Sequence, residues 1–199
     1  MDQPIKLPNT RIVTVSGRIG AGSTSLAHNL AKTLGWRHVE GGEIFWEAVR
    51  NKMNLAPKDT KLRPDEEDLL FEEKQKEMLK NEEYLVLESK LAGFCASEMA
   101  DVFRIAVVCE DKEGNDQVET RVKRLIDREK VSLEEATAEV LEREANDLNK
   151  WRRLYAKNDP NWIYWDKKYY NATVNTYFLN QEECLKQALE AMNFKKNEN

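Results

Sequence analysis

The chain has 199 residues, of which 41% are apolar and 34% are charged, and its formal net charge is -5 at pH 7. This composition predicts one globular domain over residues 1–199 and excludes a wholly disordered chain. The acidic balance argues against a broad nucleic-acid-binding face, and no window approaches the roughly 18 apolar residues of a membrane span. Three cysteines without C-x-x-C spacing and an N-terminus without an apolar signal core predict a reduced, cytoplasmic protein, which we expect to be a monomer.

The first predicted elements are a strand and a helix joined by a glycine-rich turn. Residues 11–16 form a short β-branched apolar run that ends at Gly17, which is typical of a buried strand. Apolar residues then recur at helical spacing over residues 24–34, and Gly35 stands where a helix would end.

Later elements alternate between the two types. Further strands are predicted at residues 37–40, 84–88, 104–109 and 172–176, where short β-branched or aromatic runs occur. Helices are predicted at residues 42–51, 64–80, 117–128, 132–155 and 180–192. Capping boxes, Ser132 with Glu135 and Asn180 with Glu183, mark the starts of the last two. The alternation predicts an α/β fold with a five-stranded, mostly parallel sheet flanked by helices.

The turn after the first strand has the spacing of a phosphate-binding P-loop. Residues 13–25 read VTVSGRIGAGSTS, which fits G-x-x-x-x-G-K-[ST] with Ser23 in the lysine position. Backbone N–H groups at a glycine turn and a helix start favour an anion even without that lysine. The alternative is a glycine turn that only joins a strand to a helix, and the flanking strand and amphipathic helix favour phosphate binding.

The loop therefore supplies the first set of candidate site residues. Thr24 takes the position of the P-loop hydroxyl that ligates Mg²⁺. The predicted ATP phosphate-binding residues are Gly17, Arg18, Ile19, Gly20, Ala21, Gly22, Ser23, Thr24 and Ser25.

Three further stretches point to a family. LGWRHVEGGEIFWEAV (34–49), EEKQKEMLKNEEYLVLESKLAGF (72–94) and TRVKRLIDRE (120–129) together resemble the cytidylate kinase-like family of nucleoside monophosphate kinases, especially its archaeal-type branch. The resemblance runs from about residue 11 to about residue 189. It implies a P-loop NTPase fold with a small acceptor-binding insertion at about 42–80 and a short lid region at about 120–155. In that branch threonine commonly replaces the P-loop lysine, so Ser23 is similar to a tolerated variant.

The resemblance implies an activity and the residues that perform it. Such kinases transfer the γ-phosphoryl of ATP to CMP or dCMP with Mg²⁺, so small-molecule nucleotides are the expected partners. Charge neutralisation and positioning carry that chemistry, and arginines are its usual agents. The predicted catalytic residues are Arg121, Arg124, Arg128 and Lys150. The predicted acceptor-binding residues are Glu43, Arg50, Gln75, Glu88 and Lys90, with Arg50 one helical turn after Trp46.

Departures from the family pattern leave two alternatives open. Trp46, Lys90 and Lys150 stand where the family has arginine, and lysine keeps the charge without the two-pronged fork. One alternative is a nucleotide-binding pseudoenzyme or regulatory module, and the other is a P-loop kinase for another small acceptor.

Some candidate residues also have plainer interpretations. The arginines at 121, 124 and 128 share one helical face, which is often only solvated. The tryptophans at 46, 151, 162 and 165 are better interpreted as core than as a base-stacking platform. Glu88 ends a predicted parallel strand, which favours a functional carboxylate over a surface charge.

Overall fold

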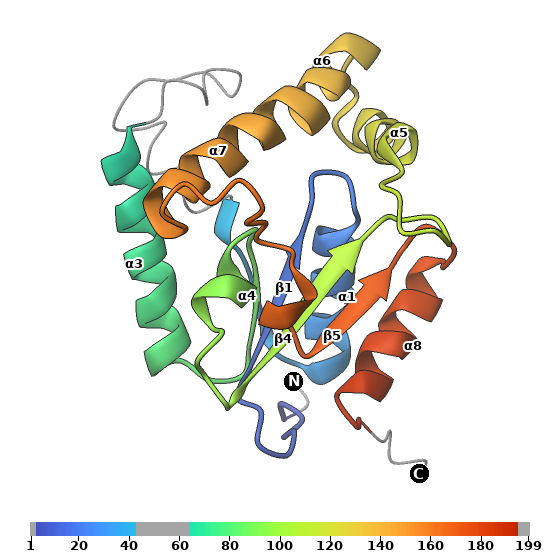
Figure 1. Cartoon of the computed structure of the whole chain (residues 1–199). Helices are drawn as coiled ribbons and strands as arrows, with labels where there is room; N and C mark the ends of the chain where they lie inside the picture. The colour runs from blue at the N-terminus through green and yellow to red at the C-terminus, as the bar shows by residue number, and fades with distance from the viewer. Residues whose placement is uncertain (1–2, 43–63, 195–199) are drawn as a thin grey trace.

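A five-stranded parallel sheet forms the centre of the protein (Figure 1). The computed structural model describes residues 3–42 and 64–194. The strands are β1 (Ile12–Gly17), β2 (Arg37–Glu40), β3 (Leu85–Glu88), β4 (Val102–Val108) and β5 (Ala172–Asn175), and their order in the sheet is β2-β3-β1-β4-β5. Every neighbouring pair is parallel, which confirms the predicted α/β sheet.

Helices cover both faces of this sheet. On one face, α1 (Ser23–Leu34) and α8 (Gln181–Ala191) pack on the inward side chains of β1, including Val13 and Val15. On the other face, α3 (Asp65–Asn81) and α4 (Ala92–Cys95) pack on residues such as Ile12 and Leu85. Burial on both faces explains why the central strands β1 and β3 are mostly apolar.

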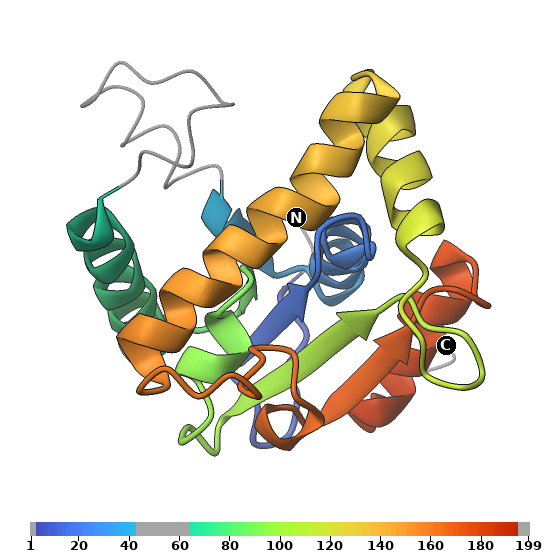
Figure 2. The ribbon, with the colours of Figure 1, turned by 45° about the horizontal axis from the view of Figure 1, so that its top comes forward.

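Four of the remaining described elements lie at the edge of the sheet toward which the strand arrows point (Figure 2): α5 (Val118–Glu129), α6 (Leu133–Thr137), the π-helical turn η2 (Ala138–Arg143) and α7 (Glu144–Tyr155). The short 3-10 helix η3 (Lys167–Tyr169) lies just before β5, near the start of that strand. The predicted helix at residues 132–155 is therefore one rod interrupted by a π turn, a feature often found near functional sites. Both predicted capping boxes are present.

Two short elements were not predicted, α4 and η3, and β4 begins two residues earlier than expected. None of the described helices is both long enough and apolar enough to cross a bilayer.

Candidate active site

The P-loop lies between the end of β1 and the start of α1. Its turn uses two glycines with positive φ, 75° at Gly20 and 102° at Gly22, and the N–H of Ala21 donates to the Arg18 carbonyl at 3.0 Å. The first N–H to bond across this helix start is that of Leu26, to the Gly22 carbonyl at 3.2 Å. The N–H groups of the first helical turn thus precede the intrahelical ladder and are available to an anion.

Glu88, at the end of β3, contacts the loop directly. The Ser23 hydroxyl, in the position of the P-loop lysine, donates to Glu88 Oε1 at 2.8 Å. Burial raises the pKa of Glu88, although the Ser23 hydrogen bond and the nearby charges of Arg128 and Lys90 act in the opposite direction. Thr24 follows Ser23 and is half-buried in the same helical turn, whereas Ser25 is exposed.

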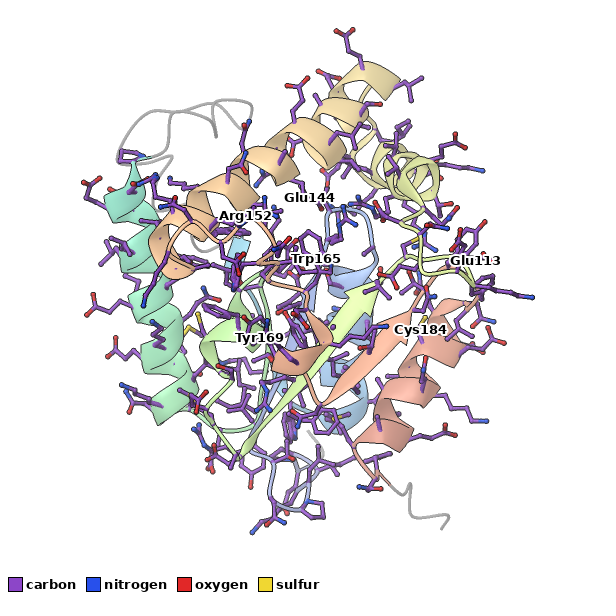
Figure 3. All side chains as sticks on the ribbon, viewed as in Figure 1. Glu113, Glu144, Arg152, Trp165, Tyr169 and Cys184 are labelled. Carbon is purple, nitrogen blue, oxygen red and sulfur yellow. The ribbon has the colours of Figure 1, made fainter. Side chains whose placement is uncertain are left out.

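Four charged side chains join the first half of the loop to α5 and α7. Arg18 pairs with Asp116 at 3.1 Å and with Glu144 at 2.5 Å, and Arg121 pairs with the same carboxylates at 2.7 and 3.1 Å. The Arg18 guanidinium also lies 4.5 Å from the centroid of the Trp165 ring. Figure 3 shows Glu144 and Trp165 beside the β1–α1 loop. We name Arg18, Arg121, Asp116 and Glu144 the charge cluster.

Two of the predicted lid arginines hold the loop through hydrogen bonds. Arg121 is fully buried, and its Nη1 donates to the Ile19 carbonyl at 2.8 Å. Arg124 donates to the Thr176 hydroxyl at 2.7 Å and to the Thr176 carbonyl at 2.8 Å. The Thr176 hydroxyl lies 2.6 Å from the Ala21 carbonyl oxygen, to which it donates.

Arg128 differs from the other two. Its side chain is 54% exposed and pairs with its neighbour Glu129 at 2.8 Å. The three arginines share one helix, but α5 buries the first, half-buries the second and exposes the third. The interpretation as a solvated basic face therefore does not fit Arg121, which is enclosed by partners.

The two predicted site lysines pair with carboxylates near α7. Lys90 Nζ lies 2.8 Å from Asp147 Oδ2 and 5.7 Å from the centroid of the Trp151 ring, and burial lowers its pKa. Lys150 forms ion pairs with Asp68 and, at 3.4 Å, with Asp65, both on α3. Through these pairs α7 contacts the segment just after β3 and the helix α3.

The inner face of α3 carries polar side chains in a buried position. Asp68, Glu72 and Gln75 are 3%, 4% and 2% exposed and recur at helical spacing. Within the part of the chain that the structure describes, neither Oε1 nor Nε2 of Gln75 has a hydrogen-bond partner. A buried amide with both ends unsatisfied is costly, which makes Gln75 a candidate for contact with a ligand.

The remaining predicted site residues have the following placements. Glu43 and Arg50 lie outside the described residues, as does Trp46, so their acceptor-binding roles stay predictions. Trp151 and Trp162 are each 6% exposed in an apolar cluster, which confirms them as core.

Sequence reasoning did not single out Asp116, Glu144 or Thr176 as parts of the site. Asp116 and Glu144 stand among many other acidic residues, and the pairs that join them to Arg18 and Glu144 to Arg121 are distant in the chain. Thr176 had a signal, because it is the last residue of a predicted strand, at the edge of the sheet where the P-loop lies.

Comparison with known proteins identifies the family. No protein-family model matches the chain. The cytidylate kinase of Natronomonas pharaonis is 32% identical over 174 residues, which cover 86% of this chain and 83% of that protein. The chain belongs to the cytidylate kinase family. Another family member, from Haloarcula marismortui, is 28% identical over 91% of this chain and 88% of its own length.

Solved structures agree on the fold. A shikimate kinase from Acinetobacter baumannii superposes with a TM-score of 0.56 at 16% identity, covering 96% of this chain and all of that one. A gluconokinase from Sinorhizobium meliloti gives a TM-score of 0.56 at 12% identity, covering 94% of each chain. The chain therefore has the P-loop kinase fold that its sequence predicts. Its relatives support the conclusion that it is a nucleotide kinase-like protein.

Proposed function

We propose that the protein transfers the γ-phosphoryl of ATP to the 5'-phosphate of CMP or dCMP. The observation that carries this proposal is the place of Glu88. Its carboxylate accepts the Ser23 hydroxyl of the P-loop at 2.8 Å, and Lys90 follows two residues later. One buried strand end thus connects the donor loop with the acceptor side, where the two phosphates must meet.

The donor side fits a triphosphate with Mg²⁺. The N–H groups of the P-loop and of the first turn of α1 would hold the phosphates. The Thr24 hydroxyl would ligate Mg²⁺, and Glu88, oriented by Ser23, would hold its water ligands. When bound, Mg²⁺ would neutralise charge on the phosphate oxygens.

The acceptor side fits a pyrimidine with an amino group. The Gln75 amide offers one acceptor and two donors, which matches the amino group and N3 of cytosine. An amide can turn to fit uracil as well, so Gln75 alone does not select the base. Asp68 and Glu72 lie on the same face, and carboxylates accept from the cytosine amino group but repel the O4 carbonyl of uracil.

The predicted catalytic residues divide by their surroundings. Arg128 has an exposed guanidinium near Glu88, and we propose that it contacts the transferred phosphoryl. Lys150 is held by two carboxylates of α3, where it would set the distance between α7 and the acceptor. Arg121 and Arg124 already make short bonds to protein oxygens.

One observation favours a second candidate, a nucleotide-binding module with little turnover. Arg18, Arg121, Lys90 and Lys150 all pair with carboxylates of the chain, which reduces the positive charge offered to phosphate.

A coupled assay for ADP release separates these functions. Wild-type protein with ATP·Mg²⁺ is tested against CMP, dCMP, UMP, AMP and GMP, and against shikimate and gluconate. We expect CMP and dCMP to give the highest kcat/KM. ATP binding without acceleration by any nucleotide would support the binding module, and turnover confined to a non-nucleotide would support a different acceptor.

A further inference from the structure

Two carbonyl groups of the P-loop accept hydrogen bonds from side chains of other elements, and we call these two the tied carbonyls. Arg121 donates to the Ile19 carbonyl at 2.8 Å, and the Thr176 hydroxyl lies 2.6 Å from the Ala21 carbonyl oxygen. Each tied carbonyl directly precedes a glycine with positive φ, Gly20 or Gly22. The same arrangement thus occurs twice in four residues of the loop.

A tied carbonyl fixes the direction of the next N–H. The described residues contain no cis peptide, and in a trans peptide the C=O and the following N–H point in opposite directions. Since the Ile19 carbonyl points toward α5, the Gly20 N–H points away from it. The Gly22 N–H likewise points away from Thr176. Two amide dipoles are therefore turned away from α5 and from Thr176, as an anion-binding loop between them requires.

Arg124 determines which way the hydrogen bond between the Thr176 hydroxyl and the Ala21 carbonyl runs. The Thr176 hydroxyl has one hydrogen, and arginine has donors but no acceptor. Because Arg124 Nη1 donates to that hydroxyl at 2.7 Å, the hydroxyl hydrogen is left for a carbonyl oxygen, and that of Ala21 at 2.6 Å is nearer than that of Val108 at 3.2 Å. The positive charge polarises the hydroxyl and strengthens its bond to Ala21. Thr176 is itself fixed by its N–H, which donates to Val108 at 2.9 Å, and it is 6% exposed.

We propose that Arg121, and Arg124 acting through Thr176, are positioning residues for the triphosphate. They hold the 19–20 and 21–22 peptide groups with their N–H groups turned toward the phosphates. These oriented dipoles partly replace the charge that a lysine at Ser23 would supply. The proposal rests on the proposed function in one respect, that the anion is the triphosphate of ATP.

One isosteric substitution, compared with a matched control, tests the hydrogen bond from the Thr176 hydroxyl to the Ala21 carbonyl. Thr176→Val removes the hydroxyl at nearly constant volume. Thr14→Val is the matched control, because Thr14 is a fully buried strand threonine whose hydroxyl has no partner among the described residues. The probe is inorganic tripolyphosphate with Mg²⁺, titrated by calorimetry. We expect Thr176→Val to weaken binding about tenfold, the loss typical of one charge-assisted hydrogen bond. Thr14→Val should bind like wild type.

A substitution that keeps the hydroxyl distinguishes the effect of the Thr176 hydrogen bond from the effect of its methyl group on packing. Thr176→Ser keeps the hydroxyl and loses the methyl group, so we expect its affinity for tripolyphosphate to stay within about threefold of wild type. Equal weakening in Thr176→Ser and Thr176→Val would overturn the proposal, because the methyl group and not the hydroxyl would then be responsible.

A double-mutant cycle tests the route from Arg124. If Arg124 acts through Thr176, Arg124→Met should weaken binding several-fold in wild type and clearly less in the Thr176→Val background. Independent, multiplying losses would mean that Arg124 acts by another route, either through its own longer hydrogen bond to the Ala21 carbonyl at 3.4 Å or by contacting the phosphate, and would contradict the route through Thr176. Tripolyphosphate binding requires no acceptor, so the two proposals can fail separately. The ADP assay can contradict the proposed function while the tripolyphosphate titrations support the positioning role, and the titrations can contradict the positioning role while the assay supports the function.

Discussion

The donor and acceptor sides of the site differ in how their polar groups are satisfied. On the donor side, the carbonyls of Ile19 and Ala21 and the guanidiniums of Arg18 and Arg121 bond to protein groups, although Nε of Arg121 and Oδ1 of Asp116 are buried without a hydrogen-bond partner among the described residues. On the acceptor side, Gln75 is 2% exposed, and its amide has no partner among the described residues. On the proposed function, the contrast between the bonded loop carbonyls and the unpartnered Gln75 amide favours a phosphate loop that is assembled before nucleotide binds and an acceptor site that is completed by its ligand.

The comparison also accounts for the absence of the loop lysine. A preassembled loop offers N–H groups at no cost of ordering, because the protein has already fixed them during folding. Such a loop needs less charge than one that must be ordered by the phosphate itself.

Glu144→Gln is expected to have the largest effect, because it leaves the two arginines of the charge cluster with one carboxylate. Breaking a buried ion pair costs roughly 3–5 kcal/mol of unfolding free energy. Glu139→Gln is the matched control, since it removes a half-exposed i,i+4 pair with Arg143 that is worth about 0.3–0.5 kcal/mol. Urea denaturation measures both, and equal losses would show that the cluster does not stabilise the donor side.

Gly20→Ala should have the next largest effect. A Cβ at Gly20 would lie 2.4 Å from the Arg121 carbonyl oxygen, and its φ of 75° adds strain. Gly114→Ala isolates that strain, because Gly114 has φ 86° with open space around it. We expect about 1–2 kcal/mol of destabilisation at Gly114, the usual cost of a left-handed residue, and clearly more at Gly20. The measurement is the free energy of unfolding, and a loss at Gly20 no larger than at Gly114 would contradict the close contact between loop and α5.

Gln75→Leu tests the acceptor side and should act in opposite directions on stability and binding. Replacing an unsatisfied buried amide with an apolar side chain should leave the unfolding free energy unchanged or raise it. Affinity for CMP should fall about tenfold, while tripolyphosphate binding stays constant. Gln187→Leu, at an exposed position on α8, is the control. Unchanged CMP binding in Gln75→Leu would remove Gln75 from the acceptor site.

The smallest effect concerns Glu88 and pH. Burial raises its pKa above the ordinary value of 4.5, so the folded ligand-free protein holds this proton more tightly than the unfolded chain does. The stability that this proton contributes is present below pH 4.5 and is lost as pH rises through the raised pKa. Thermal unfolding of wild type and Glu88→Gln across pH 4 to 8 should show wild type losing stability relative to the variant. A constant difference over that range would contradict the raised pKa.

Local sequence signals predicted most of the fold. Short apolar strands between glycines and two capping boxes indicated the sheet and its helices, because both signals are local. The four-residue helix α4 is too short to show a period, so it could not be predicted. The P-loop was likewise visible in the sequence, from Gly17 and Gly22 with a strand before them and a helix after.

The support for that loop was not predictable in the same way. Spacing placed Arg121 on a helix face with two other arginines, but its burial depends on Glu144, 23 residues away. Ion pairing across that distance leaves no local pattern, because the chain contains 36 acidic residues that could serve as partners. The role of Arg124 depends on Thr176 in the same way.

Amide NMR on one labelled sample tests the central claim most directly, because it observes both sides of the site at once. We predict that Mg²⁺-tripolyphosphate shifts the Gly22 backbone N–H and leaves the Gln75 side-chain NH₂ unchanged. CMP added afterwards should shift the Gln75 NH₂ and protect it from solvent exchange, with little further change at Gly22. A Gln75 signal that responds to no nucleotide, or a Gly22 signal that ignores tripolyphosphate, would contradict a preassembled donor loop beside a ligand-completed acceptor site.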